Sequence, residues 1–205
     1  MQYGIDVSNY TSPFASWTKD LSLVIVQAVD PPPSYPPGQT RDQIQACLDA
    51  GIAVDAYLWL WFDQDDIQSK LSLLDGLAIR TLWLDVEDSA ARRYNQVDTE
   101  AIIKAALDKC DAYGTWLARP TGIYTGSWYW TSNLYLDNST TFSDRMLWDA
   151  NYDDQSDTAV FTPYGGWTSC AIKQFAGSVV VNGISGVDHK VLSDAEAALL
   201  VRPAP

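Results

Sequence analysis

The chain has 205 residues and a formal net charge of −13. This length favours one domain with a large core, expected over residues 1–205, and the negative charge argues against nucleic acid or anionic membranes as partners. Nine Trp and eleven Tyr residues exclude disorder as the main state; they suit uncharged sugars as ligands, although large cores are also rich in aromatic residues.

The predicted elements alternate between strand and helix along the chain. In chain order they are strands at 3–8 and 23–29, a proline-rich loop at 30–39, a helix at 40–51, a strand at 52–62, a helix at 63–76, a strand at 81–87, a helix at 97–114, strands at 121–125, 146–152, 170–175 and within 183–192, and a helix at 193–201. Asp63, Asp98 and Ser193 are the expected N-caps, and Gly51 and Gly76 the expected helix ends. Continuous apolar strands alternating with helices predict a parallel sheet, and about eight strands suit closure into a barrel.

The cysteines and the N-terminal residues exclude several classes of protein. Three separated cysteines and one histidine, His189, argue against a zinc site or a disulfide framework, so we expect Cys47 and Cys110 to be buried thiols and no cofactor to be needed. The opening residues "MQYGIDVSNY" have neither the basic nor the apolar region of a signal peptide. No apolar run approaches the ~20 residues of a membrane span.

The stretch "TLWLDVEDS" places acids directly after an apolar strand. Side chains alternate along a strand, so Asp85 and Glu87 point to the same side, with Cα atoms roughly 6.5 Å apart. Crowded carboxylates raise one another's pKa, as a general acid near neutral pH requires. The alternatives are helix caps or solvated loop residues, or a site for a hard cation, although no calcium-loop signature is present.

Other predicted strands also end in polar side chains: Asp6, Asp149 with Asn151, and Asp188. The carboxyl ends of barrel strands meet at one rim, where barrel enzymes build their active sites. Several of these acids are therefore expected to share one site with the "DVE" pair.

The motifs "GIDVSNY", "VIVQA", "LWLDVE", "GIYTGSWYW", "LWDANY", "KQFAGS" and "GISGVD" occur in an order that resembles the muramidases of glycoside hydrolase family 25. The resemblance implies an α/β fold, a flattened TIM-like (β/α) barrel with about eight strands and about five helices. It also implies cleavage of the β-1,4 bond between N-acetylmuramic acid and N-acetylglucosamine. Glu87 would be the proton donor, Asp85 its partner, and Asp6 and Asp188 the other catalytic aspartates, with the nucleophile either Asp85 or the acetamido group of the substrate.

Polar and aromatic residues near the strand ends are candidates for binding the sugar rings. Stacking is expected for the aromatic residues, whereas Trp128 and Trp130 are expected to pack in the core. Alternation allows either Gln174 or Lys173, not both, to face the site. The candidate substrate-binding residues are Tyr57, Tyr124, Trp148, Asn151, Tyr152 and Gln174.

The chain also departs from the family pattern. The third strand "AYLWLWF" lacks the usual histidine, Val29 and Asp30 replace part of a Thr-Glu-Gly motif, and Lys190 stands where an asparagine is common. Two alternatives therefore remain: a hydrolase of another N-acetylated polysaccharide, and a non-catalytic glycan-binding barrel. The expected partner is peptidoglycan or a related glycan, bound by a monomer, and the expected place of action is the extracellular cell wall.

Overall fold

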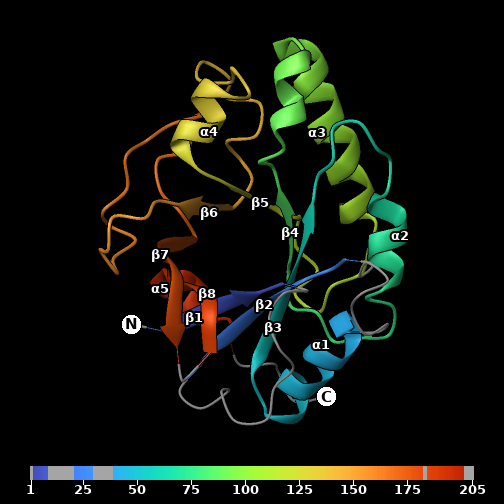
Figure 1. The fold of residues 1–205 in the computed structure, drawn as a ribbon, viewed down its shortest axis with the longest axis vertical. Helices are drawn as coiled ribbons and strands as arrows, with labels where there is room; N and C mark the ends of the chain where they lie inside the picture. The colour runs from blue at the N-terminus through green and yellow to red at the C-terminus, as the bar shows by residue number, and fades with distance from the viewer. Residues whose placement is uncertain (1, 9–20, 30–38, 182–183, 201–205) are drawn as a thin grey trace.

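The computed structural model describes residues 2–8, 21–29, 39–181 and 184–200, and the predicted proline-rich loop lies almost wholly outside them. Eight strands form a closed barrel in which sequence neighbours pair in order around the ring (Figure 1). The predicted α/β barrel is therefore confirmed. The strands are β1 (Tyr3–Val7), β2 (Leu23–Gln27), β3 (Ala53–Trp59), β4 (Leu82–Asp85), β5 (Gly122–Thr125), β6 (Leu147–Ala150), β7 (Ile172–Val181) and β8 (Ile184–Leu192).

The sheet is parallel from β1 to β7, as predicted, but β8 runs antiparallel to both of its neighbours. The reason is the chain length available: β8 begins three residues after β7 ends, and a parallel crossover needs a dozen or more. As the closing strand, β8 places Asp188 opposite Asp6 and Lys190 opposite Gly4 on β1.

Helices cover the outside of the barrel. α1 packs on β2 and β3, α3 packs on β4, and α2 packs on α3, so these three lie together along one side in Figure 1. No helix in the described part of the chain is long and apolar enough to cross a membrane. The helices are α1 (Gln39–Asp49), α2 (Ile67–Ser72), the 3₁₀ helix η1 (Ser89–Arg93), α3 (Gln96–Asp111), α4 (Ser127–Ser132) and α5 (Asp194–Ala197).

Two of the predicted N-caps are wrong. The N-cap of α2 is Asp66, because the helix begins only at Ile67, and the Asp63 carboxylate pairs with Arg93, 2.6 Å away. The N-cap of α3 is Asn95, whose Oδ1 accepts a hydrogen bond from the backbone N–H of Asp98 at 3.0 Å. The predicted cap of α5, Ser193, is confirmed.

Predicted helix ends have mixed outcomes. Gly51 follows α1 with φ of +76°, a left-handed conformation that suits a glycine helix stop. α2 is shorter than predicted and ends at Ser72, well before Gly76. The expected burial of Cys47 and Cys110 on helix faces is confirmed.

The barrel wall separates two apolar cores. Leu84 and Val86 belong to the outer core between strands and helices. The inner core fills the lumen, where Trp83 needs the space beside Gly122: a Cβ there would lie 2.4 Å from the indole. The lumen is filled by Leu23, Ile25, Tyr57, Trp83, Tyr124, Trp148, Ile172 and Leu192.

An ion-pair network closes the lumen below Trp83. Arg80, which is fully buried, donates two hydrogen bonds of 2.7 Å to Asp55, and the Trp83 indole N–H donates to the same carboxylate at 2.9 Å. Glu196 on α5 adds a second carboxylate 3.3 Å from Arg80. The charges buried at the base of the barrel are therefore paired, as buried charges must be to limit their cost.

Candidate active site

A cavity of about 230 Å³ opens at the carboxyl ends of the strands. All four carboxylates predicted to be catalytic line it, together with a group of aromatic side chains. The barrel thus brings the predicted acids together from β1, β4 and β8. The lining residues are Asp6, Tyr57, Trp59, Asp85, Glu87, Tyr124, Trp148, Tyr152 and Asp188.

The predicted alternation of the "DVE" segment is present in the structure. Asp85 is the last residue of β4, and its carbonyl accepts a hydrogen bond from Leu60 N–H at 2.8 Å. Val86 N–H donates to Tyr124 O at 3.0 Å, which extends the ladder beyond the strand. Because Val86 is buried in the outer core, Asp85 and Glu87 on either side of it both line the cavity.

Burial and crowding raise the pKa of both acids. Burial raises the pKa of Glu87 to about 7, and the charges of Asp188 and Asp6 contribute to this. Burial also holds the pKa of Asp85 well above its usual range, as do the nearby Glu87 and Asp6. Asp85 Oδ1 is buried and has no hydrogen-bond partner among the described residues, which accords with that direction.

Asp6 has a counter-ion that the sequence did not reveal. The Lys190 ammonium forms an ion pair with Asp6 Oδ1, donates to the Asp188 carbonyl at 3.2 Å, and lies 4.8 Å from the centroid of the Trp148 ring. Burial raises the pKa of Asp6, while Lys190 opposes that shift. No group of three or more His, Cys, Asp or Glu side chains in the described ranges is arranged to hold a metal ion.

Gln174, not Lys173, is the residue of β7 that faces the site. Its Nε2 lies 2.6 Å from Tyr152 Oη, 2.7 Å from Asp188 Oδ2 and 3.2 Å from Tyr124 Oη. An amide group has two protons, so the two shorter contacts are the main hydrogen bonds. Lys173 points to the other face and pairs with Asp153 at 2.8 Å.

Aromatic rings form the floor and one wall of the cavity. Trp148 is at the centre, with ring centroids 4.3 Å from Tyr124, 5.9 Å from Trp83 and 6.0 Å from Tyr57. Trp59 also lines the cavity and was missed by the sequence analysis, although its position two residues after Tyr57 puts it on the same face of β3. The same two-residue spacing links Lys190 to Asp188.

Some of the predicted residues lie elsewhere. Asn151 is not among the residues that line the cavity, and its side chain donates to Asp153 at 3.3 Å. Asp149 faces away from the lumen and accepts a hydrogen bond of 2.9 Å from Tyr164, so it does not join the other acids. Trp130 packs in the core as expected, whereas the prediction for Trp128 is wrong, because its side chain is exposed.

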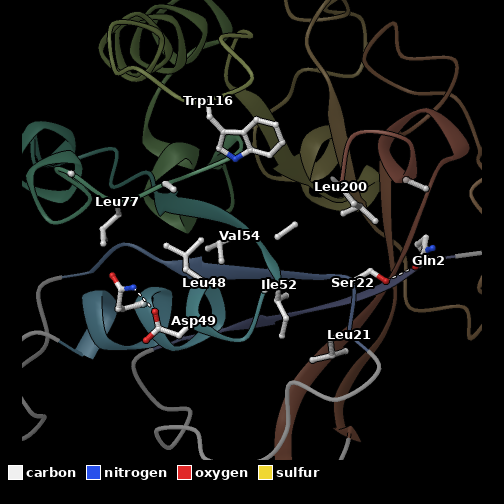
Figure 2. Close-up of a pocket in the computed structure, with 16 residues that line it drawn as sticks. Gln2, Leu21, Ser22, Leu48, Asp49, Ile52, Val54, Leu77, Trp116 and Leu200 are labelled. Carbon is white, nitrogen blue, oxygen red and sulfur yellow. Dashed lines mark hydrogen bonds between the residues drawn. The ribbon is translucent and has the colours of Figure 1, made fainter. Parts of the chain in front are cut away.

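A larger cavity, of about 760 Å³, lies at the opposite end of the barrel, beside the starts of β1, β2 and β3. Leu48, Ile52, Trp116 and Leu200 surround it in Figure 2. Its one lining carboxylate in the described part of the chain, Asp49, accepts a hydrogen bond from Gln45 at 2.8 Å. Unlike the smaller cavity, the larger one therefore offers, among its described lining residues, no pair of carboxylates for two-acid chemistry.

Comparisons with known proteins place the chain in a family. The family model described as "Lysozyme-like protein 1" matches residues 1–175. The chain belongs to this lysozyme-like family. Its resemblance to glycoside hydrolase family 25 is confirmed by "Probable GH family 25 lysozyme 3" of Dictyostelium discoideum, 27% identical over 197 residues that cover 89% of this chain and 39% of the relative.

Another relative of this lysozyme-like chain carries a different kind of name. It is "Counting factor 50" of Dictyostelium discoideum, 33% identical over 144 residues, which cover 64% of this chain and 45% of the relative. The chain thus spans less than half the length of either of these two relatives.

The fold of the lysozyme-like chain is shared with solved structures. The muramidase from Acremonium alcalophilum superposes with a TM-score of 0.74 at 18% identity, and the match covers 98% of this chain and 99% of that one. At this identity the likeness concerns the fold alone.

Proposed function

We propose that the chain is a lysozyme-type glycoside hydrolase that cleaves the β-1,4 bond between N-acetylmuramic acid and N-acetylglucosamine in peptidoglycan. One observation carries the proposal: Glu87, with its pKa raised to about 7, stands in a cavity beside three further carboxylates. Hydrolysis of a glycosidic bond needs a protonated acid beside a charged or nucleophilic partner, and this cavity supplies both.

In the proposed mechanism Glu87 donates its proton to the leaving oxygen. Asp85, two residues earlier on the same face, acts as a carboxylate, after losing its own proton: it either attacks the anomeric carbon or orients the acetamido group of the substrate for that attack. The negative charges of Asp6 and Asp188 favour the oxocarbenium-like transition state, because they lie where positive charge develops. After bond cleavage Glu87 is a carboxylate and can take a proton from the attacking water.

The proposed sugar-binding surface consists of Tyr57, Trp59, Tyr124, Trp148 and Tyr152. Tyr152 is 56% exposed, which leaves its ring free to contact a substrate. Gln174 holds Tyr152 and Asp188 in a fixed relation, so one amide links a stacking residue to an acid. Asn151 would bind substrate only if its contact with Asp153 were exchanged.

The substitution Glu87→Gln tests the proposal. It keeps the shape of the side chain but removes the transferable proton, so release of new reducing ends from purified peptidoglycan, measured by mass spectrometry, should fall at least about 100-fold. Glu100→Gln is the matched control, because Glu100 lies on α3, away from the cavity. Undiminished cleavage by a folded Glu87→Gln variant would refute the assignment.

A second candidate is hydrolysis of another N-acetylated polysaccharide. The motivating observation is the third strand, where Leu58 is buried in the outer core and Trp59 supplies a bulky ring to the cavity. Cleavage of chitin-like oligomers, with peptidoglycan left intact, would favour this candidate. Binding of either glycan with no product at any pH would favour the non-catalytic barrel instead.

The proposed place of action is the extracellular cell wall, where peptidoglycan is found, and the proposed working unit is a monomer. All four acids and all the aromatic lining residues come from one chain, so the proposed cavity needs no second subunit. Size-exclusion chromatography with light scattering measures the mass of the active species. A mass near 22.7 kDa is expected.

A further inference from the structure

Lys190 is a charged side chain buried inside the barrel. None of its side chain is exposed, and it lies on β8, two residues after Asp188 and opposite Gly4. Its ammonium reaches Asp6, two residues along β1 from Gly4. A buried ammonium is costly unless it is paired, and Lys190 has three partners: the Asp6 carboxylate, the Asp188 carbonyl and the face of the Trp148 ring.

This ion pair differs from the other buried pairs of the barrel in where it lies. Arg80 and Asp55 close the base, and Lys173 and Asp153 lie on the outer face of β7. Among the ion pairs of the described residues, only that of Lys190 includes a carboxylate that lines the catalytic cavity. The Lys190–Asp6 ion pair therefore contributes directly to the charge of the cavity.

The position of Lys190 gives it an indirect route to Glu87. Asp6 and Asp188 are the charged groups that raise the pKa of Glu87, and Lys190 acts on Asp6. His189 lies on the other face of β8, with its ring tilted against those of Tyr3 and Phe175 at centroid distances of 5.3 Å and 4.9 Å. The titratable groups that face the cavity are Asp6, Tyr57, Asp85, Glu87, Tyr124, Tyr152 and Asp188.

We propose that Lys190 is a positioning residue of the catalytic site: its ammonium keeps Asp6 a fixed, charged carboxylate, and this charge keeps the proton on Glu87. The inference rests on the proposed function for its catalytic meaning. Lys190 does not touch the substrate, because its side chain is wholly buried. Its influence passes through Asp6, which lines the cavity.

Direct titration of Glu87 tests the inference without reference to activity. The sequence holds three glutamates, Glu87, Glu100 and Glu196, so a protein with ¹³C-labelled glutamate side chains gives few carboxyl signals. In Lys190→Met the unpaired Asp6 should bind a proton more readily, because the cation that opposes its raised pKa is gone, and Glu87 should then titrate about one pH unit lower than in the wild type. An unchanged Glu87 titration in a folded Lys190→Met variant would overturn the proposal.

Two further variants separate this role from simple loss of a buried charge. Lys173→Met also removes a buried ammonium but should leave the Glu87 titration unchanged, because Lys173 pairs on the outer face. Asp6→Asn alone should lower the pH at which Glu87 titrates. Adding Lys190→Met to Asp6→Asn should cause no further shift of that pH, because the lysine acts through Asp6. An additional shift in the double variant would contradict that route.

Asp6→Asn also keeps the inference testable if Lys190→Met does not fold, because an unchanged Glu87 titration in Asp6→Asn would overturn it. The pH profile of kcat/KM adds a catalytic readout: in Lys190→Met its alkaline limb should move to lower pH together with the titration, with KM little altered. A wild-type protein that fails to cleave peptidoglycan would refute the proposed function, and the titration would still decide the role of Lys190.

Discussion

Asp6 and Asp188 lie directly opposite each other in the antiparallel pair of β1 and β8. The strand that closes the barrel therefore also completes the ring of acids around Glu87. Two like charges at facing positions would repel, and the Lys190 ammonium beside both residues offsets that repulsion. Closure of the barrel and assembly of the site are thus one structural event.

The pH dependence of activity should report the proton on Glu87. Its pKa is raised to about 7, so kcat/KM for peptidoglycan cleavage should fall as the pH rises through that value. This parameter reflects the free enzyme, in which burial and the charges of Asp188 and Asp6 act on Glu87. An alkaline limb near the ordinary glutamate value of 4.5 would contradict the prediction.

Stability should depend on pH for the same reason. A carboxyl whose pKa is raised on folding contributes stability below its unfolded pKa, and this stability is lost as the pH rises through the folded pKa. For Glu87 the window runs from 4.5 to about 7. Urea unfolding at pH 4 and at pH 8 should therefore give the free energy of unfolding of Glu87→Gln relative to that of the wild type. We expect this difference to be roughly 1–3 kcal/mol more favourable to the variant at pH 8 than at pH 4.

Glu100→Gln is the control for the stability measurement. Hydrogen bonds, first from Gln96, lower the pKa of Glu100, which is the opposite direction from Glu87. The control variant should therefore show no gain in stability at pH 8. A gain of equal size in both variants would point to general relief of the negative surface charge instead.

Gln174→Leu should impair substrate handling without unfolding the barrel. The substitution removes the donors to Tyr152 at 2.6 Å and to Asp188 at 2.7 Å, so both residues lose a fixed position. We expect kcat/KM to fall about tenfold or more, with a higher KM. Gln155→Leu, at an exposed position, is the matched control, and equal kinetics for the two variants would exclude the positioning role.

The lumen beside Trp83 should not tolerate even a methyl group. A Cβ at Gly122 would lie 2.4 Å from the indole, so Gly122→Ala should lower the free energy of unfolding by about 1–3 kcal/mol. Gly114→Ala is the comparison, since nothing lies within 4 Å of a Cβ there. Urea unfolding of the two variants measures the difference, and equal stability would mean that Trp83 moves freely.

The parts of the site that were predictable follow from local alternation. The spacing of Asp85 and Glu87 fixed their common face, and parallel strands brought Asp6 to the same rim. Asp149 lies at a strand end as well, but it has the opposite parity to Trp148, which fills the lumen. A position at a strand end therefore does not by itself predict that a side chain faces the lumen. The alternation of side chains along the strand must also place it on that face.

The parts that were missed depend on contacts between distant segments. Lys190 pairs with Asp6 across 184 residues, and no local pattern indicates that pairing. Asp63 pairs with Arg93, 30 residues away, and α2 begins four residues after it, at Ile67. α4 has few good helix formers, and it is held by packing of Trp130 against Phe142 and Trp167.

The late position of β8 in the chain has a consequence for biosynthesis. Until that strand leaves the ribosome, the nascent chain lacks both Asp188 and the partner of Asp6, and the edges of β1 and β7 are unpaired. The growing polypeptide therefore cannot assemble all four acids of the proposed site before β8 has been made. Synthesis of β8 would complete the proposed site and seal an edge prone to aggregation in the same step.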